Sequence, residues 1–149
     1  MRAVFQRVTR AKVSVDGQVV SSIGPGALIL LAVGKEDTEK DVAYTADKLV
    51  GLRVFSDEGG KMNKSLLDIG GEAIVVSQFT LYGDVKKGKR PGFDGAAPPE
   101  TGDRLYQQVV ARMRELGVPT GTGVFGAHME VELCNDGPVT ILISSQKEF

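Results

Sequence analysis

The sequence holds few of the side chains on which most enzymes depend. It has one cysteine, Cys134, one histidine, His128, and no tryptophan. A single cysteine excludes an intrachain disulfide, and no histidine pair or cysteine cluster occurs at the spacing typical of zinc ligands. A serine-histidine-aspartate triad would have to use His128, but no nucleophile and carboxylate are placed around it. We therefore expect no metal and no cofactor, with His128 on the surface or at an interface and Cys134 in the core.

Long apolar runs and phosphate-binding loops are also missing. The longest uninterrupted apolar run, Ala27 to Val33, is far shorter than the roughly 20 residues that a membrane-spanning helix needs. Polar and apolar residues alternate from Arg2 to Val8, unlike the continuous apolar stretch of a secretory signal. Gly121-Thr122-Gly123 matches neither a phosphate loop nor a dinucleotide fingerprint. These absences favour a cytoplasmic protein without a membrane partner, and they argue against nucleotide hydrolysis and hydride transfer.

Charge is nearly balanced over the whole chain but not along it. The 18 lysines and arginines and 19 acidic residues give a formal net charge of −1, which argues against binding a polyanion over the whole surface. Four cations nevertheless stand within the five residues Lys86-Lys87-Gly88-Lys89-Arg90. Such a segment can neutralise nucleic-acid phosphates, or it can be a basic loop that only faces solvent. Charge alone leaves both interpretations open.

Length and periodicity predict one domain, residues 1–149, built mainly from strands. A chain of 149 residues with 42% hydrophobic residues is suited to a single core. Apolar residues alternate with polar ones through the first 23 residues, with Asp16-Gly17 as a turn, and this pattern is typical of antiparallel strands. Further strands are predicted at Ala27 to Val33, buried on both faces, at Ala73 to Leu81, and at Met129 to Leu133 and Val139 to Ile143 on either side of an Asn135-Asp136-Gly137-Pro138 turn.

Two helices are predicted from apolar stripes at helical spacing. The first is capped by Asp37 or Thr38, and the second begins at Pro98-Pro99 and ends at Gly117. Their stripes are Val42, Ala43, Ala46, Leu49 and Val50 in the first helix, and Leu105, Val109, Met113 and Leu116 in the second. We therefore expect an α+β domain in which two helices pack on a mainly antiparallel sheet or barrel.

Two short motifs carry the functional prediction. Ser77-Gln78-Phe79-Thr80 places hydroxyl, amide and aromatic groups where a strand ends, and main-chain amides freed there could hold an oxyanion. Together with Leu81 and with Asn135-Asp136-Gly137-Pro138-Val139-Thr140, this segment resembles the paired signature of the D-aminoacyl-tRNA deacylases. The resemblance extends to Met1-Arg2-Ala3-Val4, Gln6-Arg7-Val8, Lys61-Met62-Asn63 and Ser65-Leu66, with one departure at Gly92, where the family pattern has serine.

The resemblance implies hydrolysis of the ester that joins a D-amino acid, or glycine mischarged on the alanine tRNA, to the terminal adenosine of tRNA. An aminoacyl ester is already activated, so positioning and oxyanion stabilisation can replace a full triad. Thr80 would be either a nucleophile or a group that helps to hold the ester, with the amides of Phe79 and Thr80 as oxyanion donors. We favour the second role because no base is apparent beside Thr80. Ser77, Gln78 and Phe79 would shape the pocket for the 3′ end of the aminoacyl-tRNA.

Chiral selection is implied for Gly137-Pro138, although the sequence by itself indicates only an ordinary turn there. The resemblance implies a cis bond whose neighbouring carbonyl groups face the substrate's amino group and reject L-amino acids. It also implies a homodimer in which this turn of one subunit enters the pocket of the other. Phe125 and Met129 would line the pocket, and Arg7 would steady the turn.

Two alternatives remain. The first is a tRNA-binding β-domain without catalysis, which the Lys86 to Arg90 segment would serve. The second is a relative with a trans Gly-Pro bond that removes L-alanine from mischarged tRNA.

Overall fold

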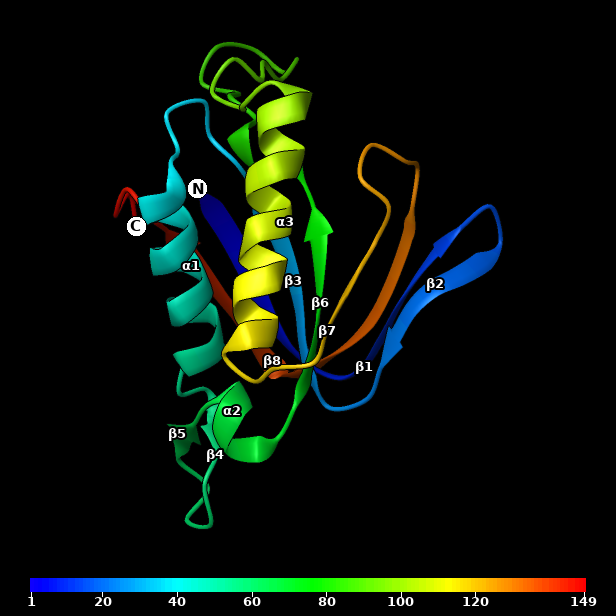
Figure 1. Cartoon of the computed structure of the whole chain (residues 1–149), viewed down its shortest axis with the longest axis vertical. Helices are drawn as coiled ribbons and strands as arrows, with labels where there is room; N and C mark the ends of the chain where they lie inside the picture. Colours follow the sequence, from blue (N-terminus) through cyan, green and yellow to red (C-terminus); the bar gives the residue numbers. More distant parts are fainter.

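One six-stranded mixed sheet organises the computed structural model, which describes residues 1–149 (Figure 1). Its strands are β1 (Arg2–Val15), β2 (Gln18–Ile23), β3 (Gly26–Ala32), β6 (Glu72–Ser77), β7 (Thr120–Thr122) and β8 (Glu130–Ser144). The order is β2-β1-β3-β6-β7. β2 and β3 pair with different parts of one edge of β1, and β8 pairs with its opposite edge. Because β3 pairs with Arg2 to Val8 and β2 with Ala11 to Val15, the long β1 joins both halves of a sheet that curves towards a barrel.

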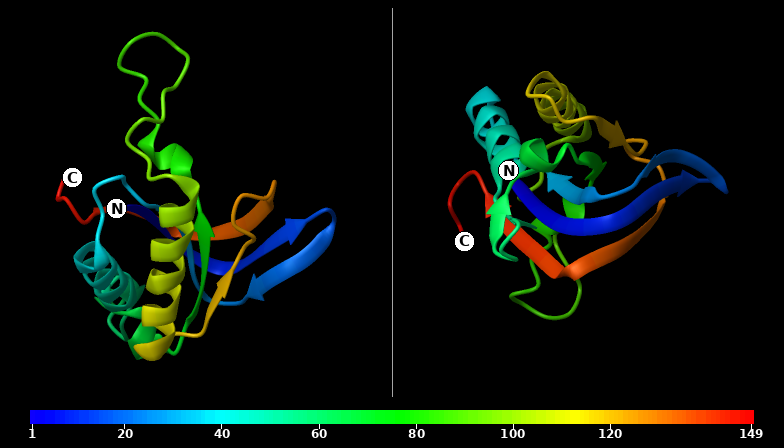
Figure 2. Two further views of the ribbon diagram at one scale, coloured as in Figure 1. Left: turned by 45° about the horizontal axis from the view of Figure 1, so that its top comes forward. Right: turned by 90° about the horizontal axis from the view of Figure 1, so that it is seen from below.

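The α+β prediction is confirmed, and the sheet has parallel pairs in addition to the expected antiparallel ones. β1 pairs antiparallel with β2, β3 and β8, whereas the β3-β6 and β6-β7 pairs are parallel. Parallel neighbours require crossover connections. The two long helices, α1 (Glu39–Gly51) and α3 (Pro99–Glu115), lie in those connections and pack side by side on one face of the sheet (Figures 1 and 2).

Both predicted helix starts are confirmed by local chemistry. The Thr38 side chain accepts a hydrogen bond from the Lys40 amide, while Asp41 Oδ2 accepts one from the Thr38 amide at 2.8 Å, which forms a capping box. α3 begins at Pro99, with Pro98 as its N-cap. Within the predicted stripe of α1, Ala43 is exposed, and Thr45 is buried instead.

Smaller elements complete the chain between the helices. A short helix, α2 (Leu66–Ile69), was not predicted, and its Ser65 cap follows a hairpin of β4 (Phe55–Ser56) and β5 (Met62–Lys64).

The main core lies between the helices and the sheet; its largest fully buried side chains include Phe5, Leu49, Tyr106 and Met113. None of the helices has both the length and the apolar character that crossing a bilayer requires.

β6 ends earlier than the sequence predicts. It stops at Ser77, and a 3₁₀ turn, η1 (Phe79–Tyr82), replaces the expected strand through Leu81. The Gln78 amide still donates to Leu31 O at 2.8 Å, but the Leu81 amide donates to Gln78 O at 3.2 Å and closes the turn. Strand alternation therefore does not describe how the side chains from Ser77 to Thr80 point.

The predicted turn at Asn135 to Pro138 is wrong, because β8 runs through it as one strand. Asn135 pairs with Val8 and Thr140 pairs with Gln6, so four residues of β8 bulge out opposite Arg7 alone. We call residues 136–139 the Gly-Pro bulge; its Gly137-Pro138 peptide bond is cis. Both flanks of the bulge pair with the same strand, so the chain does not reverse. Cys134, expected in the core, is only half-buried beside it.

Candidate functional site

A cavity of about 580 Å³ opens where β3 and β6 end at their carboxyl termini. Four segments form its wall: residues 31–33 at the end of β3, 76–79 at the end of β6, 93–106 leading into and beginning α3, and 125–131 leading into β8. Thirteen of its 19 lining residues are hydrophobic, so the cavity suits a ligand with flat or apolar parts. The carboxyl edge of parallel strands is a common place for ligands.

The structure brings part of the predicted catalytic segment to this cavity. Ser77, Gln78 and Phe79 line it, whereas Thr80 is exposed and does not. The Gln78 side-chain amide donates a hydrogen bond to Thr80 Oγ1. The internal hydrogen bonds of η1 begin with the Leu81 amide, so the amides of Phe79 and Thr80 are not used by the turn. These two N–H groups are available to an oxygen atom placed at the cavity mouth.

Aromatic side chains form much of the wall. Phe79, 59% exposed, packs edge-on against Phe93 with ring centroids 5.1 Å apart. The Tyr106 hydroxyl donates to Val75 O at 2.5 Å, and burial raises the pKa of Tyr106 to about 12, so it stays a neutral donor. Tyr106 in turn lies 6.1 Å from Phe125. Phe93 and Tyr106 were not predicted as site residues. In the sequence, Phe93 lies just after the Lys86 to Arg90 segment, and Tyr106 follows Leu105 of the apolar stripe of α3.

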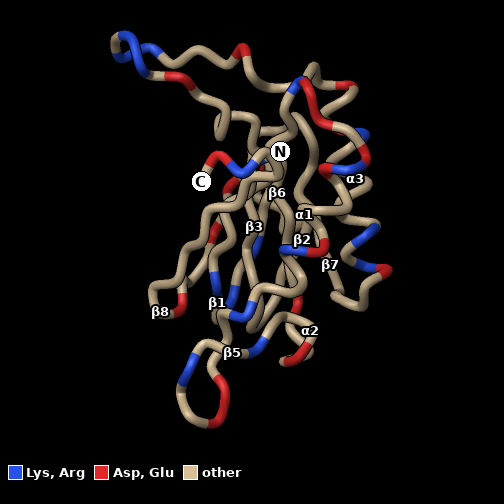
Figure 3. The backbone as a smooth tube through the Cα atoms, turned by 90° about the vertical axis from the view of Figure 1, so that its left-hand side faces the viewer, with Lys and Arg blue, Asp and Glu red and all other residues tan.

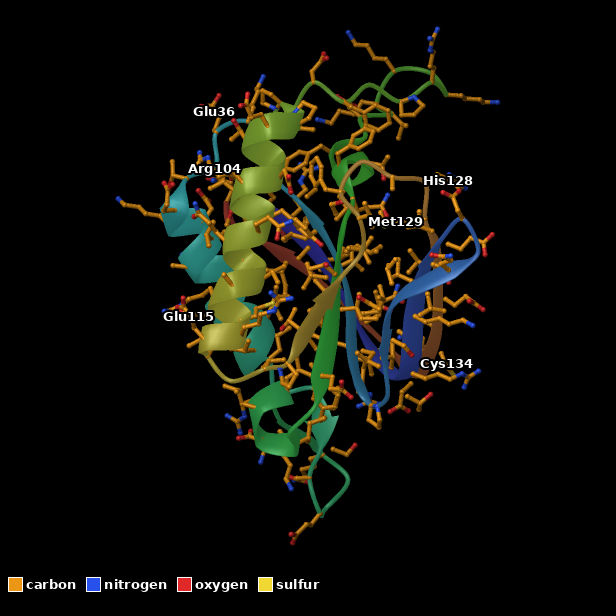
Figure 4. The ribbon with its side chains drawn as sticks, turned by 45° about the vertical axis from the view of Figure 1, so that its right-hand side comes forward. Glu36, Arg104, Glu115, His128, Met129 and Cys134 are labelled. Carbon is orange, nitrogen blue, oxygen red and sulfur yellow. The ribbon has the colours of Figure 1, made fainter.

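The opposite wall contains two further predicted site residues and His128, which is exposed as expected but was not assigned to the site. Phe125 and Met129 line the cavity, and so does the exposed His128. Figure 4 shows His128 and Met129 on the segment that leads into β8. A Cβ at Gly123 would collide with the Met129 sulfur, so a side chain there would require Met129 to shift. His128 and Tyr106 are the only titratable residues in the wall.

Arg2, near the N-terminus, contacts η1 and is itself held by Glu148, near the C-terminus. The Arg2 guanidinium donates to Leu81 O at 2.9 Å and lies 4.4 Å above the Tyr82 ring. Arg2 also pairs with Glu148 at 2.5 Å, and this hydrogen bond lowers the pKa of Glu148 to about 2. Burial raises the pKa of Tyr82 well above its ordinary value. The turn that carries Phe79 and Thr80 is therefore braced from both ends of the chain.

The Gly-Pro bulge lies away from this chain's own cavity. Neither Gly137, Pro138 nor Arg7 lines the cavity. Arg7 pairs with Ala27 on β3, four residues before Leu31 at the cavity, which corresponds to roughly 13 Å along the strand. The two predicted halves of the site are thus not brought together within one chain.

Hydrogen bonds fix the shape of the bulge. Arg7 Nε donates to Asp136 O at 3.0 Å, and Arg7 Nη1 donates to Val54 O at 2.6 Å. The Asn135 side-chain amide donates to both Arg7 O and Val139 O at 3.0 Å, which closes the base of the bulge. Gly137 and Pro138 remain exposed at its tip. The bulge is therefore an ordered projection that is accessible to another molecule.

Comparisons with known proteins agree over nearly the whole chain. Residues 4–144 match the family described as D-Tyr-tRNA(Tyr) deacylase. The D-aminoacyl-tRNA deacylases of Desulfitobacterium hafniense (strain DSM 10664 / DCB-2) and Clostridioides difficile (strain 630) are 59% and 56% identical to this chain over 149 residues, which cover both partners completely.

Solved structures share the fold. One named "c-Myc DNA Unwinding Element Binding Protein" is 44% identical, with a TM-score of 0.92, and the match covers 97% of this chain and 98% of that one. Another, "Structural Analysis of a probable eukaryotic D-amino acid tRNA deacylase", has a TM-score of 0.80 at 18% identity and covers 95% and 97%. With the motif residues at the cavity and the family match over residues 4–144, the chain belongs to the D-aminoacyl-tRNA deacylase family.

Proposed function

We propose that this protein hydrolyses the ester between a D-amino acid and the terminal adenosine of tRNA and spares the L-aminoacyl ester. Hydrolysis of D-aminoacyl-tRNA is the reaction of its family. Selection by handedness, acceptance of glycyl-tRNA and the roles of individual residues are our extension. The observation that carries the proposal is the cavity at the end of β6, where Ser77, Gln78 and Phe79 line an aromatic wall. Aminoacyl-tRNA is used in the cytoplasm, so we place the enzyme there.

Catalysis on this geometry would depend on positioning. The adenine ring can stack on the aromatic wall while the ester carbonyl faces the amides of Phe79 and Thr80. Water attacks the carbonyl carbon, the negative charge on its oxygen is held by these amides, and the 3′ oxygen of the ribose leaves with a proton. The neighbouring 2′-hydroxyl can assist the proton transfer.

The surroundings of Thr80 favour a supporting role for its hydroxyl. No aspartate, glutamate or lysine lines the cavity, and its one histidine, His128, stands in the opposite wall and forms no hydrogen bond with Thr80. Thr80 Oγ1 instead accepts the hydrogen bond of the Gln78 side chain, and Gln78 does line the cavity. Thr80 therefore orients Gln78 and supplies a main-chain amide. Phe125 and Met129 close the opposite wall.

Chiral selection would come from a second copy of the chain. The Gly-Pro bulge is exposed, is held by Arg7 and Asn135, and lies outside its own cavity. A homodimer in which the bulge of one subunit enters the other's cavity would place main-chain atoms of Gly137 and Pro138 against the substrate's α-carbon. An L-side chain would run into them, and a D-side chain would point outward. Glycine has no side chain, so glycyl-tRNA would also be hydrolysed.

Release of amino acid from four substrates tests the proposal. Purified protein is incubated with D-tyrosyl-tRNA, L-tyrosyl-tRNA, glycyl-tRNA and L-alanyl-tRNA, and the free amino acid is measured. We expect release from the D-tyrosyl and glycyl substrates alone. Equal release of D- and L-tyrosine would refute chiral selection, and preferential release of L-alanine would favour the L-alanine-removing alternative.

A nucleic-acid-binding protein without catalysis is the second candidate. It is favoured by the exposed Lys86 to Arg90 segment and by the similar solved structure whose name describes a protein that binds a DNA unwinding element. It predicts salt-sensitive binding of tRNA that leaves every ester intact, and a Thr80→Ala variant that behaves like the original protein.

A further inference from the structure

A projecting loop joins η1 to the mouth of the cavity, and we call its residues 84–92 the basic arm. Figures 2 and 3 show it extending from the body, and in Figure 3 the blue of lysine and arginine marks the backbone at its tip. Its base is closed by two main-chain hydrogen bonds, from the Asp84 amide to Gly92 O at 2.8 Å and from the Gly92 amide to Asp84 O at 3.0 Å. Gly92, where the family pattern has serine, thus closes the arm without any side chain.

The arm is attached to the site at both of its ends. It begins one residue after η1, since Gly83 separates Tyr82 from Asp84, and the Gly83 amide donates to Thr80 O at 2.9 Å. It ends next to Phe93, which lines the cavity and packs against Phe79. A molecule seated in the cavity would therefore leave it beside the base of the arm.

The positive charges of the arm are not neutralised by ion pairs within the chain. Lys86, Lys87, Lys89 and Arg90 are all exposed, and none of them forms an ion pair. Asp84, the acidic residue at the base, accepts a hydrogen bond from the Lys86 amide at 2.9 Å. Since the arm holds four of the 18 basic residues and one of the 19 acidic residues, the rest of the chain has 14 basic and 18 acidic residues. The arm is thus a local positive feature on an otherwise acidic surface.

A merely solvating role accounts poorly for this arrangement. Four like charges in five residues repel one another, and the exposed arm has no packing contacts that would compensate for this repulsion. Solubility would be served as well by cations spread over the surface, as the remaining 14 of the 18 are. The position beside the cavity mouth instead favours a ligand with negative charges that continue beyond the cavity.

We propose that the basic arm binds backbone phosphates of the tRNA whose terminal adenosine occupies the cavity. This inference rests on the proposed function, because it takes tRNA as the substrate. The 3′ end of tRNA is single-stranded, so its phosphates follow the terminal adenosine out of the cavity and past the arm. The arm contributes affinity for tRNA and takes no part in the chemistry of the ester.

The arm variant replaces all four cations: Lys86→Gln, Lys87→Gln, Lys89→Gln and Arg90→Gln. The control variant removes the same charge from exposed lysines elsewhere: Lys40→Gln, Lys48→Gln, Lys61→Gln and Lys147→Gln. Both variants and the original protein are assayed on D-tyrosyl-tRNA and on D-tyrosyl-adenosine, which has the same ester but no phosphates. Binding of uncharged tRNA is measured separately by filter retention, from about 50 mM to about 200 mM salt.

We expect the arm variant to raise KM for D-tyrosyl-tRNA by about 10²-fold at moderate salt, with kcat unchanged and full activity on D-tyrosyl-adenosine. Its binding of tRNA should depend less on salt, with a log-log slope shallower by about 3, because each phosphate contact contributes roughly 0.7 to 0.9. The control variant should differ little from the original protein.

Two results would overturn the role of the arm. One is an arm variant with the same KM and salt slope as the control. The other is an equal loss on D-tyrosyl-adenosine, which would place the arm in the chemistry instead. If neither the original protein nor either variant cleaves D-tyrosyl-tRNA or D-tyrosyl-adenosine, the proposed function fails. Filter retention still decides in that case whether the arm binds tRNA.

Discussion

Gly137 is a residue at which the fold tolerates a side chain poorly. Its φ is +136°, and an added Cβ would lie 2.9 Å from both the amide nitrogen and Cγ2 of Val139, and 3.1 Å from Arg7 Nη2. We predict that Gly137→Ala lowers the free energy of unfolding by about 1 to 3 kcal/mol and reduces hydrolysis of D-tyrosyl-tRNA. Gly24→Ala, at a position where an added Cβ meets open space, should change the free energy of unfolding by less than about 0.5 kcal/mol. Equal thermal stability of the two variants would contradict the prediction.

Thr80 distinguishes positioning from covalent catalysis. Because its hydroxyl holds Gln78, we predict that Thr80→Ala lowers kcat by about 10²-fold, while Thr80→Ser retains most of the activity. Rapid-quench kinetics provide the second readout. A burst of free tRNA equal to the enzyme concentration, with tyrosine retained on the protein, would show that Thr80 is a nucleophile and would overturn this role.

At the scale of elements, the pair of Arg2 and Glu148 braces η1. The Arg2 hydrogen bond lowers the pKa of Glu148 from 4.5 to about 2, so its stabilisation is complete above pH 4.5 and is lost as the pH falls through about 2. We predict that Glu148→Gln lowers the free energy of unfolding near neutral pH by less than about 1 kcal/mol, because both side chains of the pair are partly exposed to solvent. Urea unfolding at several pH values should show the difference from the original protein shrinking below pH 4.5. A difference that grows on acidification would contradict the brace.

The sequence predicts correctly those elements that depend on interactions between residues close together in the chain. Thr38 and Pro99 start the two long helices as expected, because caps and prolines act on their neighbours. The Gly-Pro bulge was predicted as a turn because Asp136-Gly137 has the composition of a hairpin. Only the pairing of both flanks with β1, more than 120 residues earlier in the chain, shows otherwise. Tyr106 and His128 likewise reach the cavity through tertiary packing, for which the sequence has no local signal.

The whole molecule is predicted to work as a dimer with shared sites. A double variant with Gln78→Ala and Thr80→Ala would keep a functional bulge but lose the chemistry of its cavity. A Pro138→Ala variant would keep a functional cavity but lose the function of its bulge. Each variant alone should be weakly active. An equimolar mixture, refolded together, should recover about a quarter of the original activity, because half of the dimers are mixed and each has one complete site. Mixed dimers seen by mass spectrometry without recovered activity would show that the bulge does not serve the partner's cavity.

Handedness is the property on which the proposed function depends most. The direct measurement is kcat/KM for D-tyrosyl and L-tyrosyl esters carried on the same tRNA by the same preparation of protein. We predict a ratio of at least about 10² in favour of the D-ester, since an L-side chain must displace main-chain atoms that cannot move aside. A ratio near one, or a preference for the L-ester, would contradict chiral selection by the Gly-Pro bulge.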